Sequence, residues 1–342
     1  MSLQPNARVR FVPYQPLSLM LGGFEVQMLA ALEAVRATGT LAAPLNPWSE
    51  EANYDIVHLW GLGSCHEQVV RWAESRGKSI VITALLPFVS PLSQLKYRVL
   101  GGEARSAKLN MLSKASSLVV VSEEQADVAT KMLRVPTQKV RVIPNIVHSN
   151  FIRTGRETPI SERPPGYVFC CGQVCRRKNQ HRLVEACNKI GVSVVLAGDS
   201  TPGEEEYGEK VRILLSDNPR GEWITGLSPG SDPLVDLYDG CGGFALPSEN
   251  ETQPISVLEA MARGKPVLIG NGPYSRQQAF HRACKVDPHS VMEIARGLTD
   301  VLSIPQQYVT PSDAMEKFCE ATVGIAYSNL YEEVLSSRQT SC

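Results

Sequence analysis

Several features that would mark a special class of protein are missing from this 342-residue sequence. No apolar run approaches the roughly 20 residues needed to cross a bilayer, and there is no low-complexity tract or short internal repeat. The opening MSLQPNARVR is polar and basic with no apolar stretch behind it, so we expect no secretory signal. Lys plus Arg total 34 and Asp plus Glu total 35, which excludes a general electrostatic attraction to nucleic acid or to an anionic membrane.

The cysteines form no recognisable framework. There are nine, an odd number, so we expect reduced thiols and a cytoplasmic protein. Cys170, Cys171 and Cys175 lie close together, but no second Cys/His pair follows at zinc-ligand spacing. We therefore predict that they are small buried hydrophobes and that the protein has no metal site.

Short apolar runs alternate with amphipathic stretches along the first half of the chain. The runs are rich in β-branched residues and predict buried strands at 8–12, 55–60, 79–83, 117–121 and 140–143. Between them, helical patterns cover 23–37, 64–76 and 122–133, the last opening with Ser122 and Gln125 at capping-box spacing. This alternation predicts a parallel sheet covered on both faces.

The alternation restarts after a segment rich in proline and glycine, 155–166, which we interpret as an interdomain linker. Strands are predicted at 167–171, 193–197, 222–225, 243–247 and 266–269, and helices at 179–189, 204–215, 231–239, 254–263, 289–303 and 311–336. The sequence thus predicts an α/β protein with two doubly wound, Rossmann-like parallel-sheet domains facing across a cleft, where such sheets bind ligands. We assign residues 1–160 to the first domain, 161–310 to the second and 311–342 to a C-terminal helical segment.

The segment ALPSENETQPISVLEAMARGKPVLIG (245–270) carries the first chemical signal. A strand ends in a polar loop containing Asn250 and Glu251, and a helix begins near Pro254. A phosphate could bind at the helix amino end, over Thr252, Gln253 and Ile255, with Glu259 inside the helix. The alternative for both glutamates is that they are ordinary first-turn and solvated helix residues.

The segment CGQVCRRKNQHRLVEA (171–186) carries the second signal. A strand leads into Gly172 and a basic loop with Arg176, Arg177 and Lys178, and Asn179 is a plausible cap for the next helix. Three adjacent cations beside a helix amino end could neutralise a diphosphate, although a solvated basic loop is the simpler alternative.

Together the two segments resemble the donor domain of glycosyltransferase family 4, the group 1 retaining enzymes of GT-B architecture. Glu251 and Glu259 match the family's E-x7-E pair, Lys178 matches its diphosphate-binding lysine, and EAMARGKPV matches the stretch that follows the second glutamate. The resemblance implies that Glu251 contacts the transferred sugar, Glu259 the ribose hydroxyls, and Lys178 the diphosphate. The catalytic residues implied are Glu251 and Lys178.

The resemblance extends over most of the chain. GGFE (22–25) resembles the family's N-terminal glycine loop, in which the amides of Gly22 and Gly23 approach donor phosphate or acceptor, and YSNLYEEVL resembles its last helix, which returns to the N-terminal domain. The implied partners are a nucleotide-sugar donor and a glycan, glycolipid or small-molecule acceptor, with no nucleic acid and no cofactor. No D-x-D signature of a metal-dependent transferase is present, so we predict no divalent ion.

Three departures from the family pattern are visible. Gly172-Gln173 replaces the family's glycine-arginine, so one cation is missing unless Arg176 or Arg177 supplies it. Thr252-Gln253-Pro254 replaces glycine-phenylalanine-glycine, and proline has no N–H to offer. No histidine follows the strand 79–83, where the family often uses one to place the donor sugar.

Two other functions stay open at this point. GLGSCH (61–66) follows a strand and precedes a helix, as in a dinucleotide-dependent oxidoreductase, but His66 replaces the third glycine. A nucleotide-sugar-binding protein without catalysis is the other alternative.

Two smaller features also need an interpretation. His58 lies on an apolar strand and is interpreted as a hydrogen-bonded structural residue rather than a base. The stretch 85–100 mixes apolar residues with Lys96 and Arg98; its two prolines favour loop packing over peripheral contact with a membrane or lipid acceptor.

Overall fold

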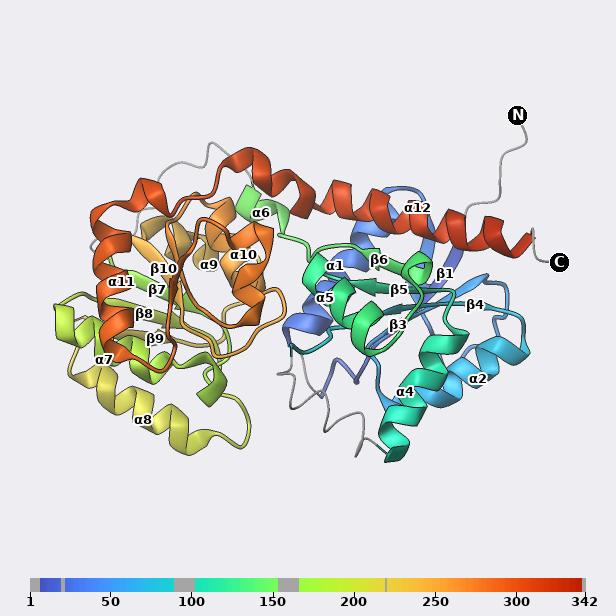
Figure 1. The fold of residues 1–342 in the computed structure, drawn as a ribbon, viewed down its shortest axis with the longest axis horizontal. Coiled ribbons are helices and arrows are strands. Elements are labelled where there is room, and N and C mark those ends of the chain that lie inside the picture. The colour runs from blue at the N-terminus through green and yellow to red at the C-terminus, as the bar shows by residue number, and fades with distance from the viewer. Residues whose placement is uncertain (1–6, 20–21, 89–101, 153–165, 219, 340–342) are drawn as a thin grey trace. The chain divides into compact units, whose positions relative to one another are not determined.

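A computed structural model of the chain describes residues 7–19, 22–88, 102–152, 166–218 and 220–339 (Figure 1). The chain divides into two compact units. Unit 1 comprises Met1–Ile146 with Glu320–Cys342, and unit 2 comprises Val147–Cys319. Residues 155–165 of the predicted linker and residues 89–100 of the mixed segment lie outside the described residues.

Unit 1 is built on a six-stranded parallel sheet in the order β2-β1-β3-β4-β5-β6. Every residue of the central strands β3, β4 and β5 is buried, as expected of strands covered on both faces. The strands are β1 (Arg8–Val12), β2 (Leu41–Pro44), β3 (Ile56–Trp60), β4 (Ser79–Thr83), β5 (Ser117–Val120) and β6 (Val140–Val142).

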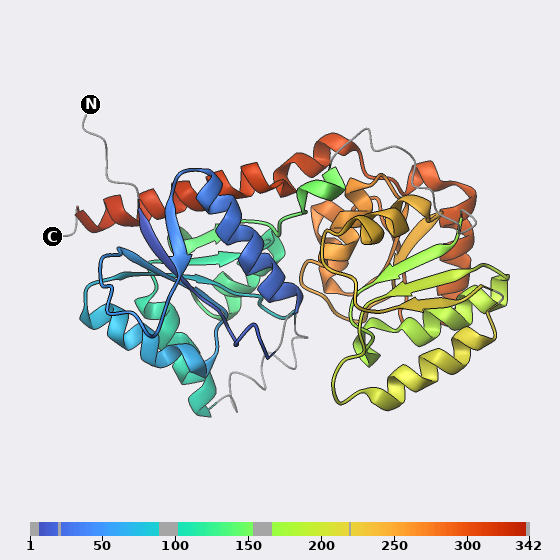
Figure 2. The same ribbon diagram turned by 180° about the vertical axis from the view of Figure 1, so that it is seen from behind.

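Two helical layers cover this sheet, one on each face. Helices α1 (Gly23–Ala37) and α12 (Glu320–Gln339) pack against each other and share one apolar core with β1. Helices α2 (Glu67–Ser75) and α4 (Gly102–Lys114) pack over the opposite core, where α5 (Glu123–Asp127) and a π-helical turn also lie (Figure 2). Helix α12 therefore belongs to unit 1 although it ends the chain, because its aromatic and aliphatic side chains complete the first core.

Unit 2 repeats the plan with a six-stranded parallel sheet in the order β12-β11-β10-β7-β8-β9. The strands are β7 (Val168–Cys171), β8 (Val194–Ala197), β9 (Glu222–Ile224), β10 (Gly243–Leu246), β11 (Val267–Gly270) and β12 (Cys284–Val286). Helix α7 (Gln180–Ile190) packs against α8 (Glu205–Ser216) and α11 (Val291–Ser303). The short helix α6 (Ser149–Ile152) packs against α9 (Asp232–Gly240) and α10 (Ile255–Ala262). The predicted fold class, two doubly wound parallel-sheet domains, is confirmed.

The divisions between the units differ from the predicted boundaries at 160/161 and 310/311, and hydrogen bonds show why. The Gln27 side chain in α1 holds Ile146, donating to its carbonyl (2.9 Å) and accepting from its N–H (2.6 Å). The next residue, Val147, donates to the Phe318 carbonyl (2.8 Å) and forms a bridge with Cys319. The chain therefore enters unit 2 at Val147 and leaves it at Cys319.

Two short strands, the helix α4 and the four-residue helix α6 were not predicted. LAAP in β2 and CKV in β12 contain few β-branched residues and lie at sheet edges, where Pro44 is tolerated. The sequence of α4, GEARSAKLNMLSK, has too few apolar residues to show helical periodicity.

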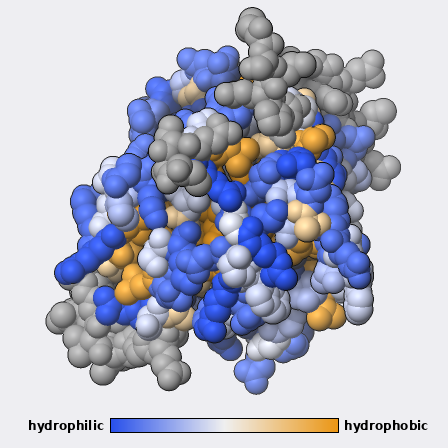
Figure 3. Space-filling model, turned by 90° about the vertical axis from the view of Figure 1, so that its right-hand side faces the viewer, coloured by the Kyte–Doolittle hydropathy of each residue, from blue (hydrophilic) through white to orange (hydrophobic). Residues whose placement is uncertain are grey.

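None of the described helices combines the length and apolar character needed to cross a bilayer. The face drawn in Figure 3 is mainly hydrophilic, with its apolar residues in separate small groups.

Candidate functional site in unit 2

The topology of unit 2 itself singles out one place for a ligand. From β7 the chain proceeds through β8 and β9 towards one edge of the sheet, and the later strands β10, β11 and β12 build the other side. The order therefore reverses between the neighbours β7 and β10. Doubly wound sheets bind ligands outside the carboxyl ends of their strands at such a switch point. The two sequence motifs, 171–186 and 245–270, contain the loops that leave these two strand ends, 172–179 and 247–254.

Lys178 and Glu251 meet at this switch point. Glu251 Oε1 lies 3.3 Å from Lys178 Nζ and 2.6 Å from Arg177 Nη1, and it accepts a hydrogen bond from Ser248 Oγ at 2.8 Å. The side chains of Lys178 and Glu251 are only 12% and 11% exposed. Burial alone would raise the pKa of Glu251, but Lys178 and Arg177 outweigh it and lower the pKa. The loop thus holds a carboxylate ionised between two cations.

Backbone contacts fix the two loops to each other. Glu249 N–H donates to the Arg177 carbonyl at 2.9 Å, and the Arg177 guanidinium donates to the Asn250 carbonyl at 2.5 Å. Gly172 has a φ of +137°, and a Cβ there would lie 2.8 Å from Lys178 Nζ. The backbone conformation therefore favours glycine at 172, and a side chain there would displace the ammonium group of Lys178.

Asn179 holds the start of α7 in a way that the sequence did not reveal. It occupies the predicted cap position, but its φ of 58° is left-handed and its side chain does not cap the helix. Its buried amide instead donates to the carbonyls of Pro247 (3.2 Å) and Pro288 (3.1 Å). Asn179 thereby ties the basic loop to the end of β10.

Of the two arginines proposed to replace the missing cation, only Arg177 reaches Glu251. Arg176 turns towards α8: its N–H donates to Glu204 (2.6 Å), its guanidinium lies 3.9 Å from Glu206, and it lies over the Tyr207 ring. Gln173 is exposed, and its carbonyl accepts from the Gln180 side chain at 2.9 Å.

The loop before α10 places the other predicted donor-binding residues. Asn250 has a buried side-chain oxygen with no hydrogen-bond partner among the described residues. Gln253 is 5% exposed and its amide donates to Gln277 (3.1 Å), whose own amide donates to the Thr252 carbonyl. Helix α10 begins at Ile255, and a helix amino end offers N–H groups and a positive dipole to an anion.

Glu259 lies inside α10, apart from the Glu251 ion pairs. It is 8% exposed, and Tyr238 donates to its carboxylate at 2.7 Å. Burial raises the pKa of Glu259 to about 7, with the Tyr238 hydrogen bond opposing the shift. Sequence reasoning missed Tyr238 and Ser248: Tyr238 lies on the apolar side of α9, where only its core role showed, and Ser248 is a lone serine at a strand end.

The predicted glycine loop lies in unit 1, where Gly23 is the first residue of α1. The Gly22 N–H donates to the Glu25 carboxylate at 3.0 Å, and Glu25 is 4% exposed. This amide is therefore already occupied, and the amino end of α1 already carries an acidic residue.

His58 is a structural residue, as the sequence indicated. It is completely buried, and its ring nitrogens lie 2.8 Å from Tyr331 Oη and 2.8 Å from Thr83 Oγ1. Burial lowers the pKa of His58 to about 3, so the ring is neutral at physiological pH.

The GLGSCH loop does not fit a dinucleotide. Cβ atoms at Gly61 and Gly63 would lie 2.4 and 2.5 Å from the ring of Tyr14. The space beside these glycines, which a pyrophosphate would need, is filled by that ring.

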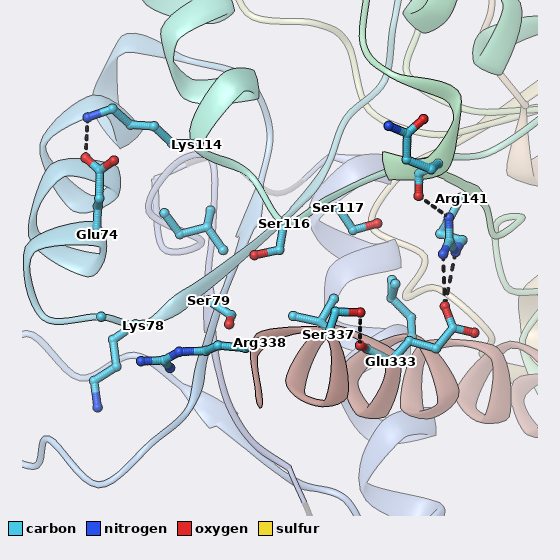
Figure 4. Close-up of a pocket in the computed structure, with 15 residues that line it drawn as sticks. Glu74, Lys78, Ser79, Lys114, Ser116, Ser117, Arg141, Glu333, Ser337 and Arg338 are labelled. Atoms are coloured by element: carbon cyan, nitrogen blue, oxygen red, sulfur yellow. Dashed lines mark hydrogen bonds and ion pairs between the residues drawn. The ribbon is translucent and has the colours of Figure 1, made fainter. Parts of the chain in front are cut away.

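A cavity of about 420 Å³ lies in unit 1, at the amino ends of β4 and β5 (Figure 4). Most of its charged groups already have partners: Lys114 pairs with Glu74, and Arg141 pairs with Glu333 at 3.0 Å. Lys78 donates to the carbonyls of Ala52 and Tyr54. Because it lies at the amino rather than the carboxyl ends of the strands, this cavity is not the ligand crevice of a doubly wound sheet.

Two doubly wound units, with a lysine–glutamate pair at the switch point of the second, define a glycosyltransferase of GT-B architecture. Comparison with known proteins agrees. The family model "Glycosyl transferases group 1" matches residues 155–318, and the model "Glycosyltransferase Family 4" matches residues 26–151. The chain belongs to glycosyltransferase family 4, the group 1 enzymes.

The individual relatives share little sequence identity with this chain. A D-inositol 3-phosphate glycosyltransferase of Actinosynnema mirum is 26% identical, covering 88% of this chain and 77% of the relative. Anabaena HepE, solved with UDP and glucose, has a TM-score of 0.70 at 15% identity, covering 96% of this chain and all of that one. The sucrose-phosphate synthase of Thermosynechococcus elongatus has a TM-score of 0.73 at 16% identity, covering 97% and 100%. At these identities the structural likeness shows the fold.

Proposed function

We propose that this glycosyltransferase takes a sugar from a nucleoside diphosphate sugar bound at the β7/β10 switch point and transfers it to a hydroxyl group with retention. The observation that carries the proposal is the cluster of Lys178, Arg177 and Glu251 on the two loops of the switch point. HepE has been solved in complex with UDP-glucose as well as with UDP, which makes UDP-glucose the first donor to test.

In the proposed reaction the bond between the anomeric carbon and the diphosphate oxygen breaks, and the diphosphate leaves with the electron pair. Lys178 and Arg177 stabilise the negative charge that grows on the leaving group, together with the amino end of α10. The acceptor oxygen forms the new bond to the anomeric carbon, and its proton passes to the departing diphosphate. Because protein cations supply the neutralising charge, we propose that transfer needs no divalent ion.

Glu251 has two roles in this scheme. Without ligand it neutralises Lys178 and Arg177. When a diphosphate attracts these cations, the carboxylate is released to accept hydrogen bonds from the sugar hydroxyls. The buried oxygen of Asn250 has no hydrogen-bond partner in the described part of the chain, and we propose that it accepts a hydrogen bond from a further sugar hydroxyl. We assign Glu259 to the ribose.

Two further parts of the proposal concern Gln173 and location. Gln173 replaces the family's arginine, so we propose that Arg177 takes over that charge.

All cysteines in the described part of the chain are free thiols, which suits a reducing compartment and supports a cytoplasmic location.

A thermal-shift screen tests the proposal, because a ligand that binds only the native state raises its melting temperature. UDP, GDP, dTDP and their common sugars are the probes, with NAD and NADP as negative controls. We expect stabilisation by one nucleoside diphosphate and its sugar, and severe loss of turnover in folded Lys178→Ala and Glu251→Ala variants. Stabilisation by NAD or NADP alone, or full activity in both variants, would contradict the proposal.

A further inference from the structure

Unit 1 has a switch point of its own, between β1 and β3. From β1 the chain passes to β2 on one side, and strands β3 to β6 build the other side. By the argument that located the donor site, the carboxyl ends of β1 and β3 form the ligand crevice of unit 1. Residues 13–19 leave the first of these strand ends, and residues 61–66 leave the second.

An aromatic ring is built into this switch point. Tyr14, two residues after β1, lies against the backbone of Gly61 and Gly63 on the loop after β3. Any side chain at either glycine would meet the ring, since Cβ atoms would lie 2.4 and 2.5 Å from it. Yet Tyr14 is 44% exposed. The ring is therefore supported from the protein side and partly open to solvent.

Polar contacts fix the backbone around the ring. The two nitrogens of buried His66 lie 3.0 Å from the carbonyl oxygens of Gly61 and Pro13, so the imidazole lies between the two loops and its N–H donates to one of these carbonyls in either tautomer. The Cys65 thiol donates to the Tyr14 carbonyl at 3.4 Å. The His66 ring also stands edge-on to Tyr14, with centroids 6.2 Å apart. A ring fixed in this way loses little side-chain entropy when a ligand covers it.

The helix that follows β1 has an acidic residue in its first turn, which favours a neutral ligand over a phosphate in this crevice. At the amino end of α1, which follows β1, the Gly22 N–H is already bonded to the buried Glu25 carboxylate. An acidic residue in this position disfavours a phosphate, whereas the corresponding loops of unit 2 carry Arg177 and Lys178. The two switch points are therefore suited to different parts of the reaction.

We propose that Tyr14 is the platform on which a neutral sugar ring of the acceptor stacks. This proposal rests on the proposed transfer function and names the acceptor class and its contact. The faces of a pyranose carry C–H groups that pack on an aromatic ring, and the phenolic hydroxyl can bond a sugar hydroxyl at the ring edge. Tyr14 thus selects for a carbohydrate acceptor and positions it, while the donor contacts remain in unit 2.

Saturation-transfer NMR tests this binding without knowledge of the natural acceptor. The probes are methyl α-D-glucopyranoside, methyl α-D-galactopyranoside and methyl α-D-mannopyranoside, each measured with UDP in the same tube. We expect the ring protons of at least one glycoside to receive saturation from the wild-type protein. In Tyr14→Ala the affinity for that glycoside should fall roughly 3- to 10-fold, the range for a lost aromatic contact. Trp72→Ala, which removes a half-exposed ring from α2, should leave it unchanged.

Gly63→Ala is a second variant that moves the ring without removing it. Gly63 has a φ of −109°, which alanine adopts freely, so the main conflict is between the new methyl group and the Tyr14 ring. We expect it to weaken glycoside binding in the wild-type background and to have little further effect in Tyr14→Ala. Such non-additivity would tie the effect to the ring.

The outcomes separate this proposal from the donor assignment. The proposed role of Tyr14 would be wrong if the wild-type protein saturated none of the glycosides, or if Tyr14→Ala bound the glycoside equally well. UDP binding would still be measured in the same samples. Loss of the UDP signal in Tyr14→Ala would reassign the ring to the donor. Absence of UDP binding in the wild-type protein, with glycoside binding intact, would count against the donor site instead.

Discussion

Replacing Glu251 by glutamine should separate the two roles of this carboxylate, because it removes the charge and keeps the shape. In the unliganded protein Glu251 neutralises Lys178 and Arg177, with N–O distances of 3.3 and 2.6 Å. A diphosphate must draw these cations away from Glu251 before it can use their charge. We therefore expect Glu251→Gln to bind UDP more tightly than the wild-type protein does, and to transfer sugar more slowly.

The structure sets the size of the effect. The Lys178–Glu251 pair is largely buried and is screened little, whereas the Arg177 side chain is 48% exposed and its pair contributes less. A hydrogen bond to a charged group contributes about 1.5–3 kcal/mol, of which the incoming diphosphate restores a part. A net difference of about 1.4 kcal/mol corresponds to a roughly tenfold lower Kd for UDP. Turnover should fall by about 100-fold or more, because the sugar loses a charged acceptor in the transition state.

Isothermal titration calorimetry with UDP measures the first quantity, and UDP release from UDP-glucose in the presence of acceptor measures the second. Glu249→Gln is the matched control, because Glu249 lies in the same loop as Glu251 and also contacts basic residues. Its carboxylate lies 3.9 Å from Arg182 and 3.5 Å from His289. It should leave UDP affinity within about twofold, as expected for a partly exposed pair. Equal or weaker UDP binding by Glu251→Gln would refute the idea that the carboxylate and the diphosphate share these cations.

Three stability predictions can be measured by urea unfolding. Burial raises the pKa of Glu259 from 4.5 to about 7. Between these two pH values the native state keeps a proton that the unfolded chain has released. The free energy of unfolding therefore falls as the pH rises from 4.5 to 7, by about 3 kcal/mol at most. Glu259→Gln should remove this loss between pH 5 and 8, and parallel curves for variant and wild type would contradict it. Asn179→Gly loses two hydrogen bonds (3.1 and 3.2 Å) but adopts the left-handed backbone easily. Asn179→Ala loses the same bonds and is strained at this φ, so it should lower the free energy of unfolding by about 1 kcal/mol more. Equal destabilisation by the two variants would show that the backbone at 179 is not strained. Gly270→Ala would place a Cβ 2.2 Å from the Ser248 carbonyl oxygen and should lower the free energy of unfolding by roughly 1–3 kcal/mol. An unchanged urea midpoint would mean that the loop at Ser248 moves aside without cost.

The alternation of β-branched runs with amphipathic stretches was enough to predict the doubly wound fold. It located ten of the twelve strands in the described sheets to within a residue or two. The strands that escaped, LAAP and CKV, are held by pairing with a neighbour at the sheet edge rather than by their own composition. Propensity cannot reveal such strands, because the stabilising contacts come from other parts of the chain.

The cluster of Lys178, Arg177 and Glu251 could be predicted because each of these residues follows the carboxyl end of a strand. Strand order then brings Lys178 and Glu251 together although the chain separates them widely. The contacts that hold Glu259 and the start of α7 were not predictable. Tyr238 and Asn179 act through positions that resemble ordinary core and cap residues, and the GLGSCH glycines proved to support Tyr14 rather than a dinucleotide.

The central claim is that a nucleoside diphosphate binds at the β7/β10 switch point through Lys178. Calorimetry tests this claim directly, by titrating UDP, GDP and dTDP into the wild-type protein, Lys178→Ala and Lys189→Ala. Lys189→Ala is the control, because Lys189 is an exposed lysine in the last turn of α7, the helix that begins just after Lys178. We predict that one nucleotide binds the wild-type protein, that Lys178→Ala binds it about 10- to 100-fold more weakly, and that Lys189→Ala binds it unchanged. Wild-type affinity in Lys178→Ala, or an equal loss in Lys189→Ala, would contradict the claim.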